Sequence, residues 1–263
     1  MAALFLPILL LGHYFYLFAV FCGLLSVYGT IEITKVADKA SSLPRFMMIL
    51  APVVAGAMYI FAYLMLDRLI PGVTIAVYLG LAVLVVMTVN LFVTHNLHRN
   101  WLYLLIISVY VGVAFAGLST IRGIGLLHIV YVLLTAMLTD TFAYFIGVKY
   151  GKHRLAEKIS PKKSIEGAIS GLVIGGGLAS VFAIFLKLFA MHWALVVLLS
   201  FGLSLIGQIG DLVKSKIKRD YGVKDFSNLF PGHGGIMDRF DSWTFTALGL
   251  VVIAELFNIV FTL

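Results

Sequence analysis

The stretch "ALVVLLSFGLSLIGQIGDLVKSKIKRD", residues 194–220, is apolar in its first half and strongly basic at its end. A helix rises 1.5 Å per residue, so about 20 apolar residues cross a hydrocarbon core of about 30 Å. Asp211 is the first charged residue of the stretch. The pattern therefore predicts a membrane-spanning helix over 192–213 that continues into a basic loop at the membrane surface.

The composition of the whole chain indicates the same environment. Of its 263 residues, 62% are hydrophobic and 12% are charged, and the mean hydropathy is +1.07. A soluble domain is about half apolar and about a quarter charged. This much apolar surface cannot be hidden in one soluble core, so lipid must solvate much of it. Cys22 is the single cysteine, which excludes an intrachain disulfide.

Other apolar runs are long enough to span a membrane. They lie at 45–66, 72–93, 101–119, 124–148, 167–188 and 242–262, and residues 2–31 form either one long span or a tight pair. We therefore predict an all-α polytopic membrane protein with eight or nine transmembrane helices and two basic cytoplasmic loops. We treat 1–263 as a single integral membrane domain, with N-terminal membrane helices in 1–123 and a catalytic membrane half in 124–263.

The net charge of +7 is concentrated in two places. Twelve of the 19 Lys and Arg residues lie in 149–163 and 214–239. Short basic loops stay on the cytoplasmic side of a membrane. The chain crosses twice between the two segments, so we expect both on the cytoplasmic face of a multi-pass protein of the cell membrane. A charge gathered in two loops fits lipid headgroups and gives no reason to expect a nucleic-acid partner.

Three polar residues follow one face of the helix at 207–220. Asp211, Ser215 and Lys218 are spaced at i, i+4 and i+7. An aspartate near the membrane interior costs about 2.5–3.5 kcal/mol and is a functional candidate by default. The alternative is that Asp211 only neutralises Lys214 or Lys218, and the spacing leaves both interpretations open.

A Gly-rich turn, "PGHGG" at 231–235, precedes the last span. Its glycines allow backbone N–H groups to approach an anion, and a helix start follows. Asp238 and Asp241 are three apart and are expected to share a face of that helix, with Arg239 beside them. Acidic residues at a helix N-terminus also complement the helix dipole. This structural interpretation suits Asp241 alone better than it suits two carboxylates that face Asp211.

Carboxylates without clustered Cys or His indicate a hard cation. Mg²⁺ usually takes one or two carboxylates and leaves its other positions to water and phosphates. We therefore predict Mg²⁺ held by Asp211 and Asp238, with a second cation left open. His233 is expected to donate to a phosphate rather than bind metal, because no second His or Cys lies at ligand spacing.

The segment "DTFAYFIGVKYGKHRLAEKISPKKSIEG", 140–167, adds another acid and more cations. Asp140 lies late in a span and Tyr144 follows one turn later. Ser160 or Ser164 could cap the next helix, with Pro161 in its first turn. Membrane topology alone explains the lysines but not Asp140. Carboxylates, cations and an N–H-rich turn together suit a polyphosphate bound at the membrane surface.

A set of residues at fixed spacing resembles the C-terminal signature of the phosphatidate cytidylyltransferases, or CDP-diacylglycerol synthases. It comprises Ser215, Lys218, Arg219, Lys224, Asp225, Ser227, Phe230, Pro231, His233, Gly234, Gly235, Asp238, Arg239 and Asp241. "DTFAY", "SPKKS" and "GQIGD" also resemble blocks of that family, in its order. The resemblance implies a dimeric membrane transferase of phospholipid biosynthesis. Such an enzyme uses CTP, phosphatidic acid and a divalent metal to form CDP-diacylglycerol and pyrophosphate.

The chemistry of the residues, together with this resemblance, gives the expected roles. The expected catalytic set is Asp211, Asp238, Lys218, Arg219, Lys224, His233 and Arg239, in which the Lys and Arg residues clamp phosphates. The expected substrate-binding set is Asp140, Tyr144, Ser160, Lys162, Lys163, Ser215, Gly234, Gly235 and Asp241.

Two other functions stay open at this point. A transporter or ion channel also has many spans and buried acids, but it predicts acids near mid-membrane in both halves of the chain. A CTP-dependent lipid kinase, or a synthase that uses another lipid phosphate, would share the same polar residues.

Overall fold

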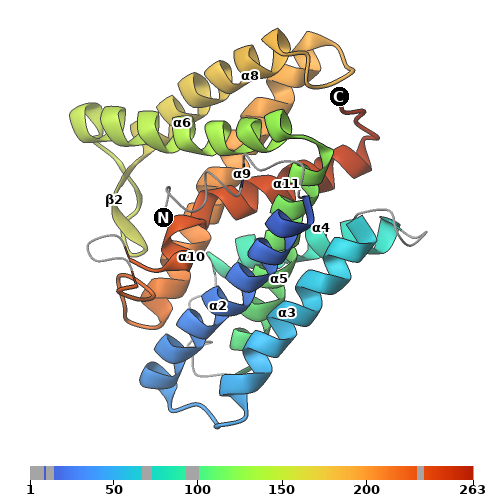
Figure 1. Ribbon diagram of the computed structural model, residues 1–263. Coiled ribbons are helices and arrows are strands. Elements are labelled where there is room, and N and C mark those ends of the chain that lie inside the picture. The colour runs from blue at the N-terminus through green and yellow to red at the C-terminus, as the bar shows by residue number, and fades with distance from the viewer. Residues whose placement is uncertain (1–8, 10–14, 67–72, 93–100, 230–233, 263) are drawn as a thin grey trace.

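The computed structural model describes residues 9, 15–66, 73–92, 101–229 and 234–262, and this part of the chain is mostly helical (Figure 1). Its elements, in chain order, are α2 (Phe15–Ser41), α3 (Met47–Leu66), α4 (Val73–Asn90), α5 (Trp101–Ile124), α6 (Leu126–Tyr150), β1 (Arg154–Ala156), β2 (Ser160–Ser164), α7 (Ile165–Ser170), the π-helical turn η2 (Gly171–Gly175), α8 (Gly176–Phe185), α9 (Trp193–Asp220), α10 (Ile236–Arg239) and α11 (Asp241–Leu256).

Six of the described helical segments are long and apolar enough to cross a membrane. They are α2, α3, α5, α6, the continuous run α7–η2–α8, and α9. The apolar part of α11, Ser242–Leu256, is shorter. The predicted class, an all-α membrane protein, is confirmed, and the total of eight or nine spans stays a prediction.

The first long helix extends beyond the apolar run that predicts it. The run 2–31 ends the expected span near residue 31 and leaves a loop over 32–44, but α2 runs without a break to Ser41. Neither Gly nor Pro interrupts 30–41, and Pro44 is the first helix breaker after that segment. Lys35 and Lys39 therefore extend from a helix. Most of residues 2–14 lies outside the described residues, so the choice between one span and two stays open.

Helix α11 joins the two halves of the chain. Helices α2, α3 and α5 of the first half pack on one another, and α6, α8 and α9 of the second half form another packed group. Figure 1 shows α11 between these groups, where it contacts α4, α5, α6 and α9. The rings of Tyr110 on α5 and Phe245 on α11 meet edge to face, 5.7 Å apart. The proposed division at 123 and 124 thus falls at a tight turn, Gly125, between two helices that are in contact.

A row of glycines lets the helix pair α6 and α7–η2 approach closely. A methyl group at Gly175 would lie 2.7 Å from Thr139 Cα, and one at Gly171 would lie 2.9 Å from Ala143 Cβ. The spacing of Gly167, Gly171 and Gly175 predicts this close helix packing, and the structure confirms it.

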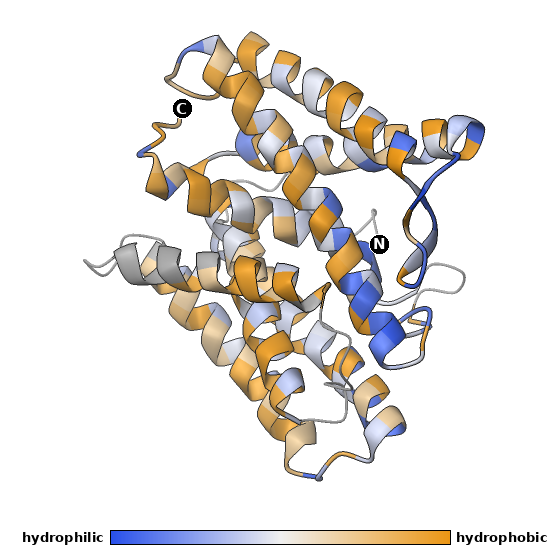
Figure 2. Ribbon diagram, turned by 180° about the vertical axis from the view of Figure 1, so that it is seen from behind, coloured by the Kyte–Doolittle hydropathy of each residue, from blue (hydrophilic) through white to orange (hydrophobic). Residues whose placement is uncertain are grey.

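Polar residues gather at one end of the molecule. Figure 2 shows hydrophilic residues on the β1–β2 hairpin, on the last turns of α9 and on the segment that leads to α10. Arg219 Nε near the end of α9 donates to the carbonyl of Ile159 in the hairpin turn at 3.3 Å. The two basic segments of the sequence therefore meet at the same end of the helix bundle.

Candidate active site

A cavity of about 570 Å³ lies between α6, the β1–β2 hairpin, α7 and α9. Five of the predicted site residues line it: Asp140 and Tyr144 from α6, Lys162 and Lys163 from β2, and Asp211 from α9. This volume is within the range of about 300–1,000 Å³ that is usual for small-molecule sites. Segments that are distant in sequence thus bring two acids and two lysines to one cavity.

The cavity has polar walls that the sequence alone did not indicate. Arg154 of β1 and Gln208 of α9 also line it, and Gln208 Nε2 donates to the carbonyl of Ala168 at 3.2 Å. The exposed side chains of Val148 and Leu155 form an apolar part of the wall. Cationic and apolar surfaces are therefore adjacent, as a molecule with a charged head and an oily tail would require.

The hairpin that carries the lysines is closed at its base by Glu166. This carboxylate accepts from the backbone N–H of Lys152 at 3.1 Å and contacts His153 Nδ1 at 2.6 Å. Ser164 caps α7, because its Oγ accepts from Gly167 N at 3.1 Å. Ser160 instead pairs with Ala156 across the hairpin.

The position of Pro161 corrects a detail of the prediction. We expected Pro161 in the first turn of the helix after the basic loop. It lies in strand β2, because 154–164 forms a hairpin and the helix begins only at Ile165. The register Arg154↔Ser164 directs the backbone there into an extended pairing.

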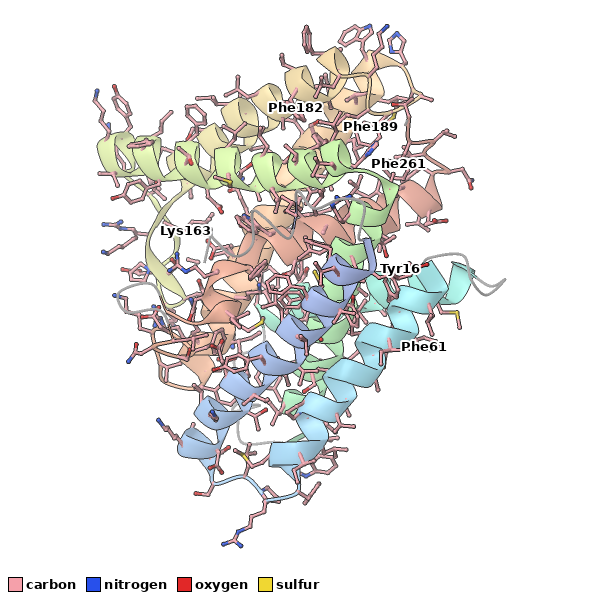
Figure 3. All side chains as sticks on the ribbon, in the orientation of Figure 1. Tyr16, Phe61, Lys163, Phe182, Phe189 and Phe261 are labelled. Atoms are coloured by element: carbon pink, nitrogen blue, oxygen red, sulfur yellow. The ribbon has the colours of Figure 1, made fainter. Side chains whose placement is uncertain are left out.

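Asp211 pairs with a lysine from another element. Lys163 Nζ on β2 forms an ion pair with Asp211 Oδ2, and the two side chains are 26% and 22% exposed. Figure 3 labels Lys163 on the hairpin at the polar end of the molecule. Lys214, one of the expected neutralising partners, donates instead to Phe240 O at 2.6 Å and Thr244 Oγ1 at 3.1 Å. Asp211 is thus held at the cavity wall by a cation from the hairpin.

Asp140 is anchored by a residue of α11. Its Oδ2 accepts from Ser242 Oγ, at the start of α11, at 2.8 Å. Asp140 and Asp211 both line the cavity, while their partners Ser242 and Lys163 belong to α11 and β2. Four elements therefore fix the two carboxylates.

Asp238 lies in a second cluster next to the Gly-rich turn. Its carboxylate accepts from Lys218 Nζ at 3.0 Å and from the N–H groups of Phe226 and Gly235 at 2.9 Å each. Gly234 has φ +74°, a backbone conformation that favours glycine. Asp238 therefore binds Gly235 of the turn and Phe226 before it, and its carboxylate orients Lys218. Asp238 is not among the residues that line the cavity.

The helix after this turn is broken. We expected Asp238 and Asp241 to share one face of a single helix, but α10 ends at Arg239, and α11 begins at Asp241 after Phe240. The interactions of Lys214 with Phe240 and Thr244 stabilise this break. Asp238 and Asp241 therefore belong to different helices, and the side chain of Asp241 is outside the described part.

The remaining predicted residues lie around these two clusters. Arg219 is bonded to backbone carbonyls, that of Val223 at 2.8 Å and that of Ile159. Lys224 and Arg239 are exposed, and Ser215 is half-buried on α9. His233 lies outside the described residues.

Sequence reasoning missed Glu32 on α2. This side chain is buried and accepts from Ser227 Oγ at 2.7 Å and from the N–H groups of Ile236 and Met237 at 3.2 Å each. The signal that could have found it is the criterion applied to Asp211, an isolated acid at the end of an apolar run.

The donor set around the cavity suits a hard divalent cation. The groups there that could bind a metal ion are oxygen atoms, from the carboxylates of Asp140 and Asp211, the amide of Gln208 and the hydroxyl of Ser164. The described residues contain no group of three or more His, Cys, Asp and Glu side chains placed to hold a metal ion. Mg²⁺ commonly needs only one or two carboxylates when substrate phosphates complete its shell. The residues present therefore fit the predicted cation.

Comparison with known proteins relates the chain to one family. The model of the cytidylyltransferase family matches residues 1–257. A phosphatidate cytidylyltransferase of Bacillus subtilis is 40% identical over 159 residues, and one of Staphylococcus haemolyticus is 46% identical over 136 residues. These alignments cover 59% and 52% of this chain, and the same shares of the two relatives. The chain thus aligns with between half and two thirds of the length of these curated relatives.

Proposed function

The chain belongs to the cytidylyltransferase family, and from this membership and the polar cavity we propose that it transfers the cytidylyl group of CTP to phosphatidic acid. The products are CDP-diacylglycerol and pyrophosphate. The observation that carries the proposal is the cavity, where two carboxylates meet Arg154, Lys162 and Lys163 beside an apolar wall.

The reaction needs little acid–base chemistry. A phosphomonoester has a second pKa of about 6, so the phosphate of phosphatidic acid is largely ionised near neutral pH. One of its oxygens attacks the α-phosphorus of CTP. The bond from that phosphorus to the bridging oxygen breaks, and pyrophosphate leaves with the electron pair. Catalysis then depends on alignment and on neutralising the leaving group.

The residues of the cavity supply these two functions. Lys162 and Arg154 provide cationic contacts for phosphates, and Lys163 orients Asp211. Lys218, held by Asp238, extends the cationic surface along α9 toward the Gly-rich turn. Tyr144 and Val148 border the side on which an acyl chain would remain in lipid.

We propose Asp211 as a Mg²⁺ ligand, with Asp238 the second ligand that the sequence predicts. Asp140, which lines the same cavity as Asp211, is the alternative second ligand. Bound Mg²⁺ would supply positive charge to the triphosphate. The protein's own residues hold its ligands in place through Lys163, Lys218 and Ser242.

The proposed setting is the cell membrane, with the cavity on the cytoplasmic side, where CTP is available. We also propose a homodimer, as the family resemblance implies.

One experiment separates the proposed transfer from the lipid kinase alternative. Purified protein is incubated with phosphatidic acid, Mg²⁺ and CTP labelled at the α- or the γ-phosphate. We expect α-label, and no γ-label, in the lipid phase. A parallel incubation contains diacylglycerol in place of phosphatidic acid. If the kinase interpretation holds, that lipid will instead acquire γ-label. Absence of both labels from the lipid, with an active related enzyme as control, would contradict the proposal.

A further inference from the structure

Glu32 is an acid buried in the apolar helix α2. Its side chain is 3% exposed. A buried carboxylate is costly unless hydrogen bonds or a cation compensate for the lost water. The location of its partners therefore indicates what this side chain does.

Among the described residues, the hydrogen-bond donors to Glu32 come from the far end of the chain. Ser227 Oγ and Ile236 N donate to Oε1 at 2.7 and 3.2 Å, and Met237 N donates to Oε2 at 3.2 Å. None of the ion pairs within the described residues involves Glu32. Within the part of the chain that the structure describes, one hydroxyl and two backbone N–H groups therefore stabilise its charge, and such N–H groups favour an anion near a helix start.

Helix α10 depends on this arrangement because it is very short. The first N–H groups of a helix have no partner within the helix, and Gly235, which precedes Ile236, has no side chain to accept from them. Asp238 accepts from Gly235 N, and Glu32 accepts from the next two N–H groups. Two carboxylates from distant elements thus share one turn of backbone.

Glycines lie on both sides of the contact between α2 and α10. A methyl group at Gly235 would lie 2.5 Å from Glu32 Oε2, and one at Gly29 would lie 2.7 Å from Met237 Sδ. A side chain at Gly235 would therefore displace the Glu32 carboxylate from the N–H groups of α10.

We propose that Glu32 is a positioning residue for Asp238 and Lys218. Glu32 fixes the first turn of α10, Asp238 extends from that turn, and the Asp238 carboxylate orients the Lys218 ammonium. This inference rests on the proposed function, in which Lys218 and Asp238 act on the phosphates or their cation. A misplacement of about 1 Å in such a group can cost about 100-fold in rate.

The direct test is Glu32→Gln. The amide keeps one acceptor oxygen, but its NH₂ group meets a backbone N–H where an acceptor is needed. We expect kcat to fall by about 100-fold, with a smaller change in KM for CTP. A second readout is independent of catalysis: hydrogen exchange of the backbone amides at 235–239, measured in detergent micelles, should become faster.

Two further variants control the result. Asp38→Asn changes another carboxylate of α2, one that accepts from Leu43 N at 3.0 Å at the helix end. We expect its kcat and its exchange at 235–239 to equal those of the unmodified protein. Ser227→Ala removes one donor to Glu32 and should act in the same direction as Glu32→Gln, but more weakly. In the double variant the two effects should be less than additive, because the residues share one contact.

The two readouts distinguish the possible failures. Unchanged exchange at 235–239 in Glu32→Gln would overturn the contact itself. Faster exchange with unchanged kcat would overturn the positioning role. If the unmodified protein transfers no cytidylyl group, the proposed function fails while the exchange result still tests the contact. If Glu32→Gln does not accumulate in membranes, Ser227→Ala provides both readouts.

Discussion

Lys218 on α9 and Asp238 on α10 form an ion pair with an N–O distance of 3.0 Å, between side chains that are only 14% and 4% exposed. The same carboxylate accepts the N–H groups of Phe226 and Gly235. This pair connects the basic end of a membrane helix to the Gly-rich turn. Its geometry therefore links the stability of the turn to the orientation of a cation.

We expect Asp238→Asn to abolish detectable cytidylyl transfer. The neutral amide carries no charge, so the mostly buried ammonium group of Lys218 loses its counter-ion. Breaking a buried pair costs about 3–5 kcal/mol, and the partial exposure of Lys218 places this one at about 3 kcal/mol. The α-label assay measures transfer, and a thermal unfolding curve in detergent shows whether the variant remains folded.

A matched control lies on the same helix. Lys216 pairs with Asp220 at 2.5 Å, with side chains 13% and 17% exposed. Asp220 also accepts from Tyr103 Oη at 3.0 Å, so it keeps one partner when Lys216 is removed. Lys216→Met should retain near-normal transfer. An equal loss of transfer in both variants would show that the Asp238 effect is not specific to its position.

Removal of the divalent cation should stop transfer. We expect EDTA to abolish activity and added Mg²⁺ to restore it, because substrate phosphates and one or two carboxylates share the metal. Asp211→Asn should then need at least about tenfold more Mg²⁺ for half-maximal rate. The measurement is a Mg²⁺ titration of the initial rate at fixed CTP.

The same titration identifies the second ligand. Asp140 lines the cavity with Asp211, whereas Asp238 is engaged by Lys218 and two N–H groups. If Asp140→Asn raises the Mg²⁺ requirement as much as Asp211→Asn does, Asp140 is the second ligand and the pair that the sequence predicts is rejected. An unchanged requirement in Asp140→Asn would exclude Asp140 as a ligand.

The membrane helices could be predicted because each depends on local apolar content. The run 124–148 corresponds to α6, and the run 192–213 begins one residue before α9. The ends were less predictable. Helix α9 continues to Asp220 and α2 to Ser41, since polar residues do not end a helix without Gly, Pro or a competing cap.

The sequence predicted which residues form the site but did not predict which of them contact one another. Asp211 stood out because an acid is costly near a membrane, but its partner Lys163 is on a hairpin that no local pattern indicated. Alternation of apolar and polar residues is weak in "RLAEKISPKKS", so that segment resembled a loop. Glu32 was missed because its donors lie 195 to 205 residues away in sequence, and two of the described ones are backbone N–H groups, which carry no sequence identity.

Close packing between α6 and η2 should make Gly175 intolerant of a side chain. A methyl group there would lie 2.7 Å from the backbone of Thr139, which cannot rotate away. We expect Gly175→Ala to destabilise the protein by about 1–3 kcal/mol. Gly177→Ala is the control, because no atom of the described residues lies within 4 Å of its added methyl group. Thermal unfolding should show a lower midpoint for Gly175→Ala alone.

The orientation in the membrane can be tested with single cysteines. Cys22 is buried, so Cys22→Ala gives a background without a reactive thiol. Lys158→Cys in the hairpin turn and Lys224→Cys after α9 change exposed residues at the polar end, whereas Ala190→Cys lies in the connection between α8 and α9. In intact cells, a maleimide that cannot cross membranes should label Ala190→Cys and leave the other two unlabelled.

Permeabilised cells supply the control for this experiment, since all three thiols should then react. The expected pattern follows from the basic segments, which stay on the cytoplasmic side. Labelling of Lys158→Cys and Lys224→Cys in intact cells would place the polar end outside. The cavity would then face away from cellular CTP, a result that contradicts both the orientation and the proposed use of that nucleotide.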